Sequence, residues 1–328
     1  MALRLVRWVS GAVLLAAAPV ASQGSSPCLA GEVPWPLEQG KEGYHCQDAK
    51  EAADNATAFL LRNMPPWDVL QYGKITVGVI GPTVTLSLAA RQTHDWAAAV
   101  PQDIWQDWVL PYASVDESRS DWREFLAKQL KPLVDNATNL SQAALILNEN
   151  LWTVLRPQGQ VVFKSEQSPM IYDPMSTLVF GYASCTGISI LFVDALRSVG
   201  IPARLAGTPA WHNVPSDGNH NWVEIWVGVG SEGGDGWAFI EGKPAGGGET
   251  LTNPCDKWFC NQKHFGDGQT QVFAARFDRH SNTSIYPMAW DLQNQHVPGV
   301  NRTAYYHAAC AQCGVSSSLR IVEPTLVV

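Results

Sequence analysis

Seven cysteines limit the ways in which this chain of 328 residues can fold. Because the number is odd, at least one cysteine has no intramolecular partner. Their placement is also uneven. Two lie in a Pro/Gly-rich N-terminal arm, four lie in a loop-rich C-terminal region, and one stands alone between these groups. They are Cys28, Cys46, Cys185, Cys255, Cys260, Cys310 and Cys313.

The N-terminus indicates that these cysteines meet an oxidising environment. Arg4 and Arg7 precede an apolar stretch that runs from Trp8 to Val20, and small residues follow this stretch up to Ser22. The pattern is typical of a secretory signal peptide cut after Ser22; an uncleaved anchor is the alternative. Asn-x-Ser/Thr sequons support secretion, and the sites predicted to be glycosylated are Asn55, Asn136, Asn139, Asn282 and Asn301.

In a secreted chain, six of the cysteines are expected to form disulfides. The N-terminal pair is predicted to staple the arm, either to itself or to a distant loop. The four C-terminal cysteines have spacings that also suit zinc, with His264 nearby, but secretion favours disulfides and we predict no metal site. We expect Cys255 and Cys260 each to pair with one of the two later cysteines, Cys310 and Cys313.

The composition excludes several classes of protein. Hydrophobic residues make up 46% and charged residues 16%, which is unlike a disordered chain. The net charge of −8 argues against a nucleic-acid partner. The most apolar stretch after the signal, 75–90, is interrupted by Gly and Pro and is predicted to be buried core. We therefore expect no stable membrane association after signal cleavage.

Patterning along the chain predicts an α+β fold. Apolar residues recur at helical spacing from residue 47 to about 156, and a strongly apolar helix follows from Cys185 to Val199. Strand-like stretches come next, two of them joined by a Gly-rich turn. The predicted segments are a signal peptide (1–22), an N-terminal arm (23–46), a helical N-terminal region (47–160), a catalytic core (161–250) and a loop-rich, disulfide-bearing C-terminal region (251–328).

The isolated Cys185 lies where a helix is predicted to begin. Ser184 is a good N-cap, which places Cys185 in the first turn. Unpaired N–H groups and the positive end of the helix dipole favour a thiolate there. An inert buried cysteine, or half of a disulfide, is the alternative for such a residue.

A thiolate nucleophile needs a base within reach and an acceptor that orients the base. His220 begins one predicted strand, and Glu241 ends the next. Antiparallel neighbours bring the start of one strand beside the end of the other, so we expect these side chains to lie together. Considered alone, His220 could also be an ordinary histidine of a surface loop, and Glu241 could be an ordinary solvated carboxylate.

The order of these pieces resembles the transglutaminase-like core, a branch of the papain-like cysteine-enzyme fold that includes transglutaminases, peptide N-glycanases and secreted or microbial cysteine proteases. The resemblance covers about a quarter of the chain and implies a nucleophile helix packed on an antiparallel sheet. The four matching stretches are Cys185-Thr-Gly187, Gly200-Ile-Pro-Ala-Arg204, His220-Asn-Trp-Val-Glu224 and Gly236 to Glu241. The second of them is predicted to be a turn that leads into a strand.

The resemblance implies that Cys185 is the nucleophile, His220 the base and Glu241 the third member of a triad. The family usually has aspartate at the third position, and glutamate is one methylene longer. Three interpretations stay open: Glu241 acts, Glu249 or another acid replaces it, or the site has lost activity. The N–H of Cys185 is the default oxyanion donor, and the side chain of Gln167 is a second candidate, although it also suits a plain loop.

The residues and the resemblance together predict a secreted or secretory-lumen cysteine enzyme that acts on amide bonds through an acyl-enzyme. Hydrolysis by a protease or amidase is favoured over acyl transfer from protein glutamine to an amine. An inactive binding or scaffold glycoprotein on the same fold is the alternative, since fourteen tryptophans could supply a binding face. The expected substrate is a protein, peptide or glycoprotein. No cofactor is predicted, and the lack of an Asp-x-Asp-x-Asp-Gly loop predicts no calcium activation.

Overall fold

The computed structural model describes residues 28–29, 31–36, 44–165, 172–228, 235–280 and 284–314. The predicted signal peptide (1–22), Gln167 and Asn282 lie outside these residues. The asparagines of the other four sequons, Asn55, Asn136, Asn139 and Asn301, are exposed, as glycosylation would require. Their glycosylation stays a prediction.

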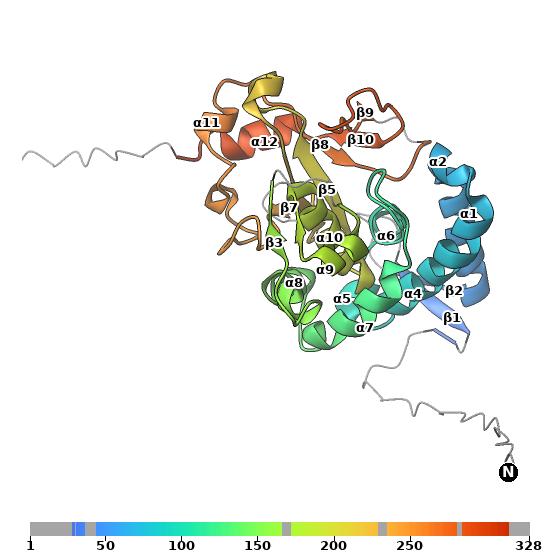
Figure 1. The fold of residues 1–328 in the computed structure, drawn as a ribbon. Helices are drawn as coiled ribbons and strands as arrows, with labels where there is room; N and C mark the ends of the chain where they lie inside the picture. Colours follow the sequence, from blue (N-terminus) through green and yellow to red (C-terminus); the bar gives the residue numbers. More distant parts are fainter. Residues whose placement is uncertain are drawn as a thin grey trace, which may run out of the picture.

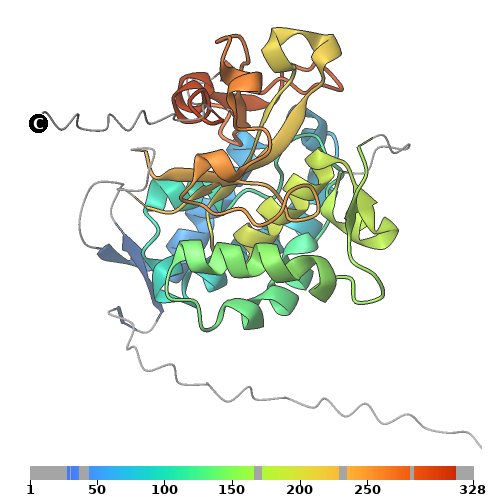
Figure 2. The ribbon, with the colours of Figure 1, turned by 90° about the vertical axis from the view of Figure 1, so that its left-hand side faces the viewer.

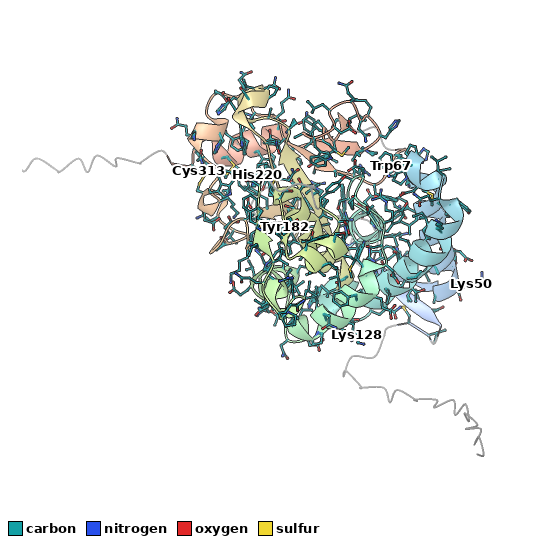
Figure 3. All side chains as sticks on the ribbon, viewed as in Figure 1. Lys50, Trp67, Lys128, Tyr182, His220 and Cys313 are labelled. Atoms are coloured by element: carbon teal, nitrogen blue, oxygen red, sulfur yellow. A yellow bond between two sulfur atoms is a disulfide. The ribbon has the colours of Figure 1, made fainter. Side chains whose placement is uncertain are left out.

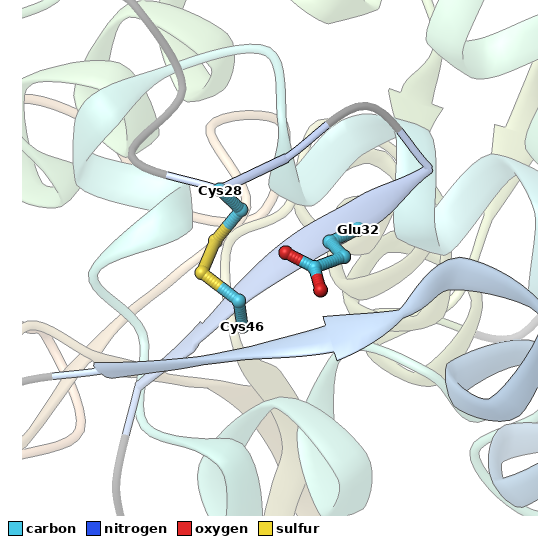
Figure 4. A group of neighbouring side chains, drawn as sticks. All are labelled: Cys28, Glu32 and Cys46. Carbon is cyan, nitrogen blue, oxygen red and sulfur yellow. A yellow bond between two sulfur atoms is a disulfide. The ribbon is translucent and has the colours of Figure 1, made fainter.

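A stapled hairpin begins the described chain. Strands β1 (Glu32–Pro36) and β2 (Tyr44–Asp48) pair in antiparallel fashion, and a disulfide joins Cys28 to Cys46. Figure 4 shows Glu32 beside this bridge, where its carboxylate and the two sulfurs lie within 4.8 Å of one another. Two sulfurs that are bonded to each other offer no thiolate ligand, so this group is a covalent staple and not a metal centre.

The segment after the hairpin is mostly helical. Its two longest helices start at side-chain caps: Asp48 accepts the N–H groups of Lys50 and Glu51 at 2.9 and 3.0 Å, and Asn139 accepts that of Gln142 at 2.9 Å. The helices are α1 (Ala49–Asn63), α2 (Pro66–Val69), α3 (Tyr72–Ile75), a π-helical turn (Thr76–Ile80), α4 (Gly81–Arg91), α5 (Asp95–Ala98), α6 (Gln102–Trp108), α7 (Trp122–Val134) and α8 (Leu140–Val154).

The run Tyr72–Arg91 is long and apolar enough, by length and composition alone, to cross a membrane. Helices inside a protein core pass the same test. Ile80 and Val84 belong to the main hydrophobic core, and the buried guanidinium of Arg91 donates to the carbonyl of Val100 at 2.6 Å. These contacts fit a core helix.

The centre of the fold is an antiparallel sheet with strand order β7-β6-β5-β8-β10-β9. Strands β5, β6 and β7 are the ones that the pattern predicts after the apolar helix. Strands β8, β9 and β10 come from the region predicted to be loop-rich, and they are too short to produce a clear alternation of apolar and polar residues. The strands are β5 (Ala203–Thr208), β6 (His220–Trp226), β7 (Trp237–Ile240), β8 (Phe273–Ala275), β9 (Ser284–Ile285) and β10 (Pro298–Asn301).

Helix α10 (Cys185–Ser198) lies in the interior, between the sheet and the helices α7 and α8 (Figures 1 and 2). Every residue from Thr186 to Ser198 is buried, including the charged Asp194 and Arg197, so this mainly apolar helix is enclosed on all sides. The predicted α+β fold, with a nucleophile helix packed on an antiparallel sheet, is confirmed. The elements that lead into α10 are β3 (Val162–Phe163), α9 (Pro174–Phe180) and β4 (Tyr182–Ala183), with β3 and β4 paired in parallel.

Strands β5 and β6 are joined by a buried ionic cluster. Arg204 lies opposite Glu224 in the register and donates to it at 2.6 Å. Arg302 and the hydroxyl of Tyr306 donate to the other carboxylate oxygen at 2.9 and 3.0 Å. Burial opposes the charge on Glu224, but Arg204 and Arg302 outweigh it and lower the pKa of that carboxyl. Arg204 and Glu224, both conspicuous in the sequence motifs, are therefore structural.

Two disulfides staple the C-terminal part, Cys255–Cys313 and Cys260–Cys310, which is the predicted cross-pairing. They hold α11 (Gln262–Phe265) and α12 (Thr303–Cys310) over one part of the sheet. The four sulfurs are consumed in bridges, so the zinc alternative has no thiolates to use. Figure 3 labels Cys313 in this region and His220 at the neighbouring end of β6.

Candidate functional site

Cys185 is the first residue of α10 and the free cysteine of the chain. Ser184 stands at the N-cap position, as predicted, but its hydroxyl makes no capping hydrogen bond. The N–H groups of the first turn of a helix have no partner within the helix, so the backbone N–H of Cys185 is available as a donor. Cys185 is half-buried as a residue and lines the cleft described below.

The structure brings His220 and Glu241 together beside this thiol. His220 is the first residue of β6, and Glu241 follows directly after β7, which pairs with β6. The Nε2 atom of His220 hydrogen-bonds the Oε1 atom of Glu241, and both side chains are almost fully buried. His220 also hydrogen-bonds the side chain of Cys185. Because Nε2 is occupied by Glu241, Nδ1 is the ring nitrogen that is left for this second bond. All three predicted residues thus form one continuous chain.

The charges in this chain favour an ion pair. Burial opposes ionisation of the Cys185 thiol, but the hydrogen bond and charge of His220 and the backbone N–H of Asn221 outweigh it and lower the pKa of the thiol. Burial also opposes protonation of His220, but the charge of Glu241 and the hydrogen bonds to Cys185 and Glu241 raise its pKa to about 10. Each charge thus favours the other, and the pair is shifted toward a thiolate and an imidazolium.

Glu249, the alternative third acid, does not face the imidazole. Its Oε2 atom instead accepts the backbone N–H of Glu241 at 2.8 Å. Gln167, the second oxyanion candidate, lies outside the described residues. Among the described residues, the backbone N–H of Cys185 therefore stays the predicted oxyanion donor.

Aromatic rings surround His220. The rings of Trp258, Phe259, Trp222 and Trp211 have centroids 4.7, 5.3, 5.7 and 6.2 Å from that of the imidazole. The indole N–H of Trp258 also donates to Glu241 at 3.2 Å. These rings exclude water from the His–Glu hydrogen bond, which strengthens it. Sequence reasoning missed Trp258 because it lies in the disulfide-bearing region, without a local pattern that points to the triad.

A second polar network lies behind the nucleophile. The amide of Asn221 donates to the hydroxyl of Thr186 at 3.1 Å and accepts a hydrogen bond from the hydroxyl of Tyr286. A Cβ atom on Gly207 would lie 2.5 Å from the Asn221 oxygen, so glycine is required on the neighbouring strand. The network holds the backbone N–H of Asn221 next to the sulfur. Its tyrosine comes from a loop-rich segment that gives no sequence signal.

A cleft of about 700 Å³ opens over Cys185 and His220. Its walls carry aromatic rings and small neutral side chains, and Cys185 and His220 supply its ionisable groups. The other residues that line it are Phe163, Ser165, Ser184, Thr186, Gly218, Asn219, Ala245, Trp258, Ala289 and Trp290. An extended, uncharged group would fit this surface without burying an unpaired charge.

The helix, sheet and buried cysteine–histidine–carboxylate chain together define a cysteine-enzyme fold. Residues 129–241 match the family model described as "Transglutaminase-like superfamily", and the match ends at Glu241. This stretch is therefore a transglutaminase-like domain. The match begins inside the region predicted to be helical, and the domain boundaries proposed from the sequence stay a prediction.

Two solved structures are similar to the chain. One, described as a putative cysteine protease from Cytophaga hutchinsonii, is 15% identical with a TM-score of 0.33, and the similarity covers 64% of this chain and 66% of that one. The other, a putative protease from Parabacteroides distasonis, is 15% identical with a TM-score of 0.28, covering 49% of this chain and 33% of that one. The chain thus spans less than two thirds of either structure. A comparison with curated proteins found no match.

Proposed function

We infer that the chain is a cysteine enzyme that hydrolyses amide bonds through a thioester. The observation that carries this inference is the chain of hydrogen bonds from Cys185 through His220 to Glu241, at the foot of an open cleft. A nucleophile of lowered pKa, a base beside it and a buried carboxylate that orients the base are the parts that covalent catalysis needs.

In the first half-reaction, the Cys185 thiolate attacks the amide carbonyl carbon. A C–S bond forms, and the carbonyl electron pair moves to the oxygen, which the N–H of Cys185 stabilises. Return of that pair breaks the C–N bond, and the imidazolium of His220 gives its Nδ1 proton to the leaving amine. The product is a thioester and a neutral imidazole.

In the second half-reaction, His220 takes a proton from water while the water oxygen attacks the thioester. The second tetrahedral intermediate collapses with loss of the thiolate, which restores the ion pair and releases a carboxylic acid. Glu241 stabilises the imidazolium in both halves, because its charge lies against Nε2. The open cleft supports water as the acceptor, since its described lining carries no carboxylate that would attract a cationic amine.

The proposed substrate is a protein, peptide or glycoprotein that presents an uncharged, preferably aromatic or apolar, group beside the scissile amide. The lining by Phe163, Trp258 and Trp290 supports this preference. A secreted location is also part of the proposal, and three disulfides and the exposed sequon asparagines support it.

The test is stoichiometric labelling of the native protein with iodoacetamide at neutral pH, followed by peptide mapping. We expect labelling at Cys185 alone, and loss of amide hydrolysis in Cys185→Ala with the fold retained. Incorporation of a fluorescent amine into a glutamine protein, faster than hydrolysis, would instead identify an acyltransferase. If Cys185 reacts only after denaturation, the protein is an inactive binding or scaffold glycoprotein and the enzymatic proposal fails.

A further inference from the structure

The backbone of Glu241 is held in an unusual way. The ladder between β6 and β7 ends with the pair Val223 and Ile240, so Glu241 stands just past the last strand contact. A carboxylate on a free strand end would not be fixed against His220, since its side chain has three rotatable bonds. Two side chains from outside the sheet take the place of the missing strand.

The first is Asn148, in α8. Its Nδ2 atom donates to the carbonyl of Glu241 at 2.8 Å, and its Oδ1 atom accepts the N–H of Lys243 at 2.8 Å. One amide thus bonds residues two apart, as the backbone of a neighbouring strand would. Asn148 is buried, so both bonds are shielded from water.

The second is Glu249, whose Oε2 atom accepts the Glu241 N–H at 2.8 Å. The intervening loop turns back on itself, with the N–H of Ala245 bonded to the carbonyl of Gly242 at 2.8 Å. A Cβ atom on Gly246 would lie 2.7 Å from Cβ of Glu241 and 2.5 Å from Oε1 of Glu249. The loop closes on Glu241 because this position is glycine.

We propose that Asn148 and Glu249 are positioning residues that clamp the backbone of Glu241 from both sides, so that its carboxylate meets Nε2 of His220. The clamp rests on the proposed function and explains how a glutamate serves where an aspartate is usual. Glutamate has one more rotatable bond than aspartate, and fixing both backbone groups of the residue leaves only its side-chain torsions to be ordered against His220. It also gives the helical region a role, because α8 reaches the triad through Asn148.

The clamp is sensitive to pH. Burial raises the pKa of Glu249 to about 7, the Glu241 N–H and Lys257 lower it, and the charges of Glu241 and Asp256 raise it. Glu149 and Lys243 face it across a pocket of about 290 Å³. Since a raised pKa means a neutral acid below pH 7, the carboxylate that accepts the Glu241 N–H is present above about pH 7 and is lost as pH falls.

The experiment compares Asn148→Ala, Glu249→Ala and Glu249→Gln with the wild type. Glu149→Gln is the matched control, because Glu149 pairs with Lys243 at the surface without touching Glu241. One readout is the rate of Cys185 alkylation by iodoacetamide between about pH 5 and 9. The other is the NMR signal of the His220 Nε2 proton, which reports the bond to Glu241 whether or not the thiol reacts.

We expect both alanine variants to alkylate about tenfold more slowly at neutral pH, equivalent to one unit in the thiol pKa, and to shift the Nε2 proton signal upfield. Glu249→Gln retains an oxygen acceptor but not the charge, so at every pH it should resemble the wild type with Glu249 protonated, and it should lose the change in rate near pH 7. Glu149→Gln should match the wild type.

Unchanged rates and an unchanged Nε2 signal in Asn148→Ala and Glu249→Ala would overturn the clamp. If Asn148→Ala does not fold, Glu249→Ala decides, because Glu249 lies half-exposed on a loop. A wild-type Cys185 that is inert in the folded protein would instead overturn the proposed function, and the NMR signal would still test the clamp.

Discussion

Among single residues, a side chain that does not touch the sulfur contributes to the reactivity of Cys185 through His220. Glu241 stabilises the imidazolium, and the imidazolium stabilises the thiolate. In Glu241→Gln the shape is kept and the charge is lost, so the pKa of His220 falls and that of the thiol rises. We expect alkylation at pH 6 to slow by more than about tenfold.

The control for this prediction is Glu241→Asp, which keeps the charge but shortens the side chain by one methylene while the clamp holds the backbone in place. It should also lose reactivity. A wild-type rate in Glu241→Gln would show that the carboxylate does not set the protonation of His220.

The pH dependence of hydrolysis follows from the same pair. Because the pKa of His220 is raised to about 10, the imidazolium that protonates the leaving amine is present below pH 10 and disappears above it. Because the pKa of the thiol is lowered, the thiolate forms at a lower pH than that of an ordinary cysteine. The profile of kcat/KM should therefore be broad, with an alkaline limb near pH 10. An alkaline limb near pH 7 would contradict the assignment.

At the scale of elements, the β5–β6 pair depends on charges that are wholly buried. In Glu224→Gln, Arg204 and Arg302 lose their shared carboxylate in the interior. Breaking a buried pair in this way costs about 3–5 kcal/mol, measured as a lower urea midpoint. Since the pKa of Glu224 is lowered by folding, its contribution is present above the ordinary carboxyl pKa and is lost as pH falls through the folded value. A midpoint within error of the wild type would contradict this role.

Which parts of the site could be predicted from sequence depends on where each residue sits in its element. Cys185, His220 and Glu241 stand at the starts and ends of strongly patterned elements, so their meeting could be predicted from an apolar helix and two adjacent strands. Trp258 and Asn148 reach the triad by long-range packing, which leaves no trace in local spacing. The strands β8 to β10 escaped prediction because segments of two to four residues carry almost no periodicity.

At the scale of the whole molecule, the C-terminal staples support the site as well as the fold. Trp258 and Phe259 lie between Cys255 and Cys260 and contact His220. In the double variant Cys260→Ser/Cys310→Ser, we expect a loss of about 2–5 kcal/mol in unfolding free energy. The Cys185 alkylation rate should fall in parallel, because water gains access to the His–Glu bond. If the variant is destabilised but its Cys185 alkylation rate is unchanged, then Trp258 and Phe259 keep their places around His220 without the Cys260–Cys310 disulfide.

The position of Cys185 has a consequence for how the protein matures. The groups that lower the pKa of its thiol, His220 and the backbone N–H of Asn221, come from β6, so the unfolded chain holds an ordinary thiol at this position. Thiol–disulfide exchange needs a thiolate, and the unfolded chain offers few of them at Cys185. In the nascent chain Cys185 therefore has no advantage over the other six cysteines in disulfide exchange, and its enhanced nucleophilicity arises only when the sheet has formed.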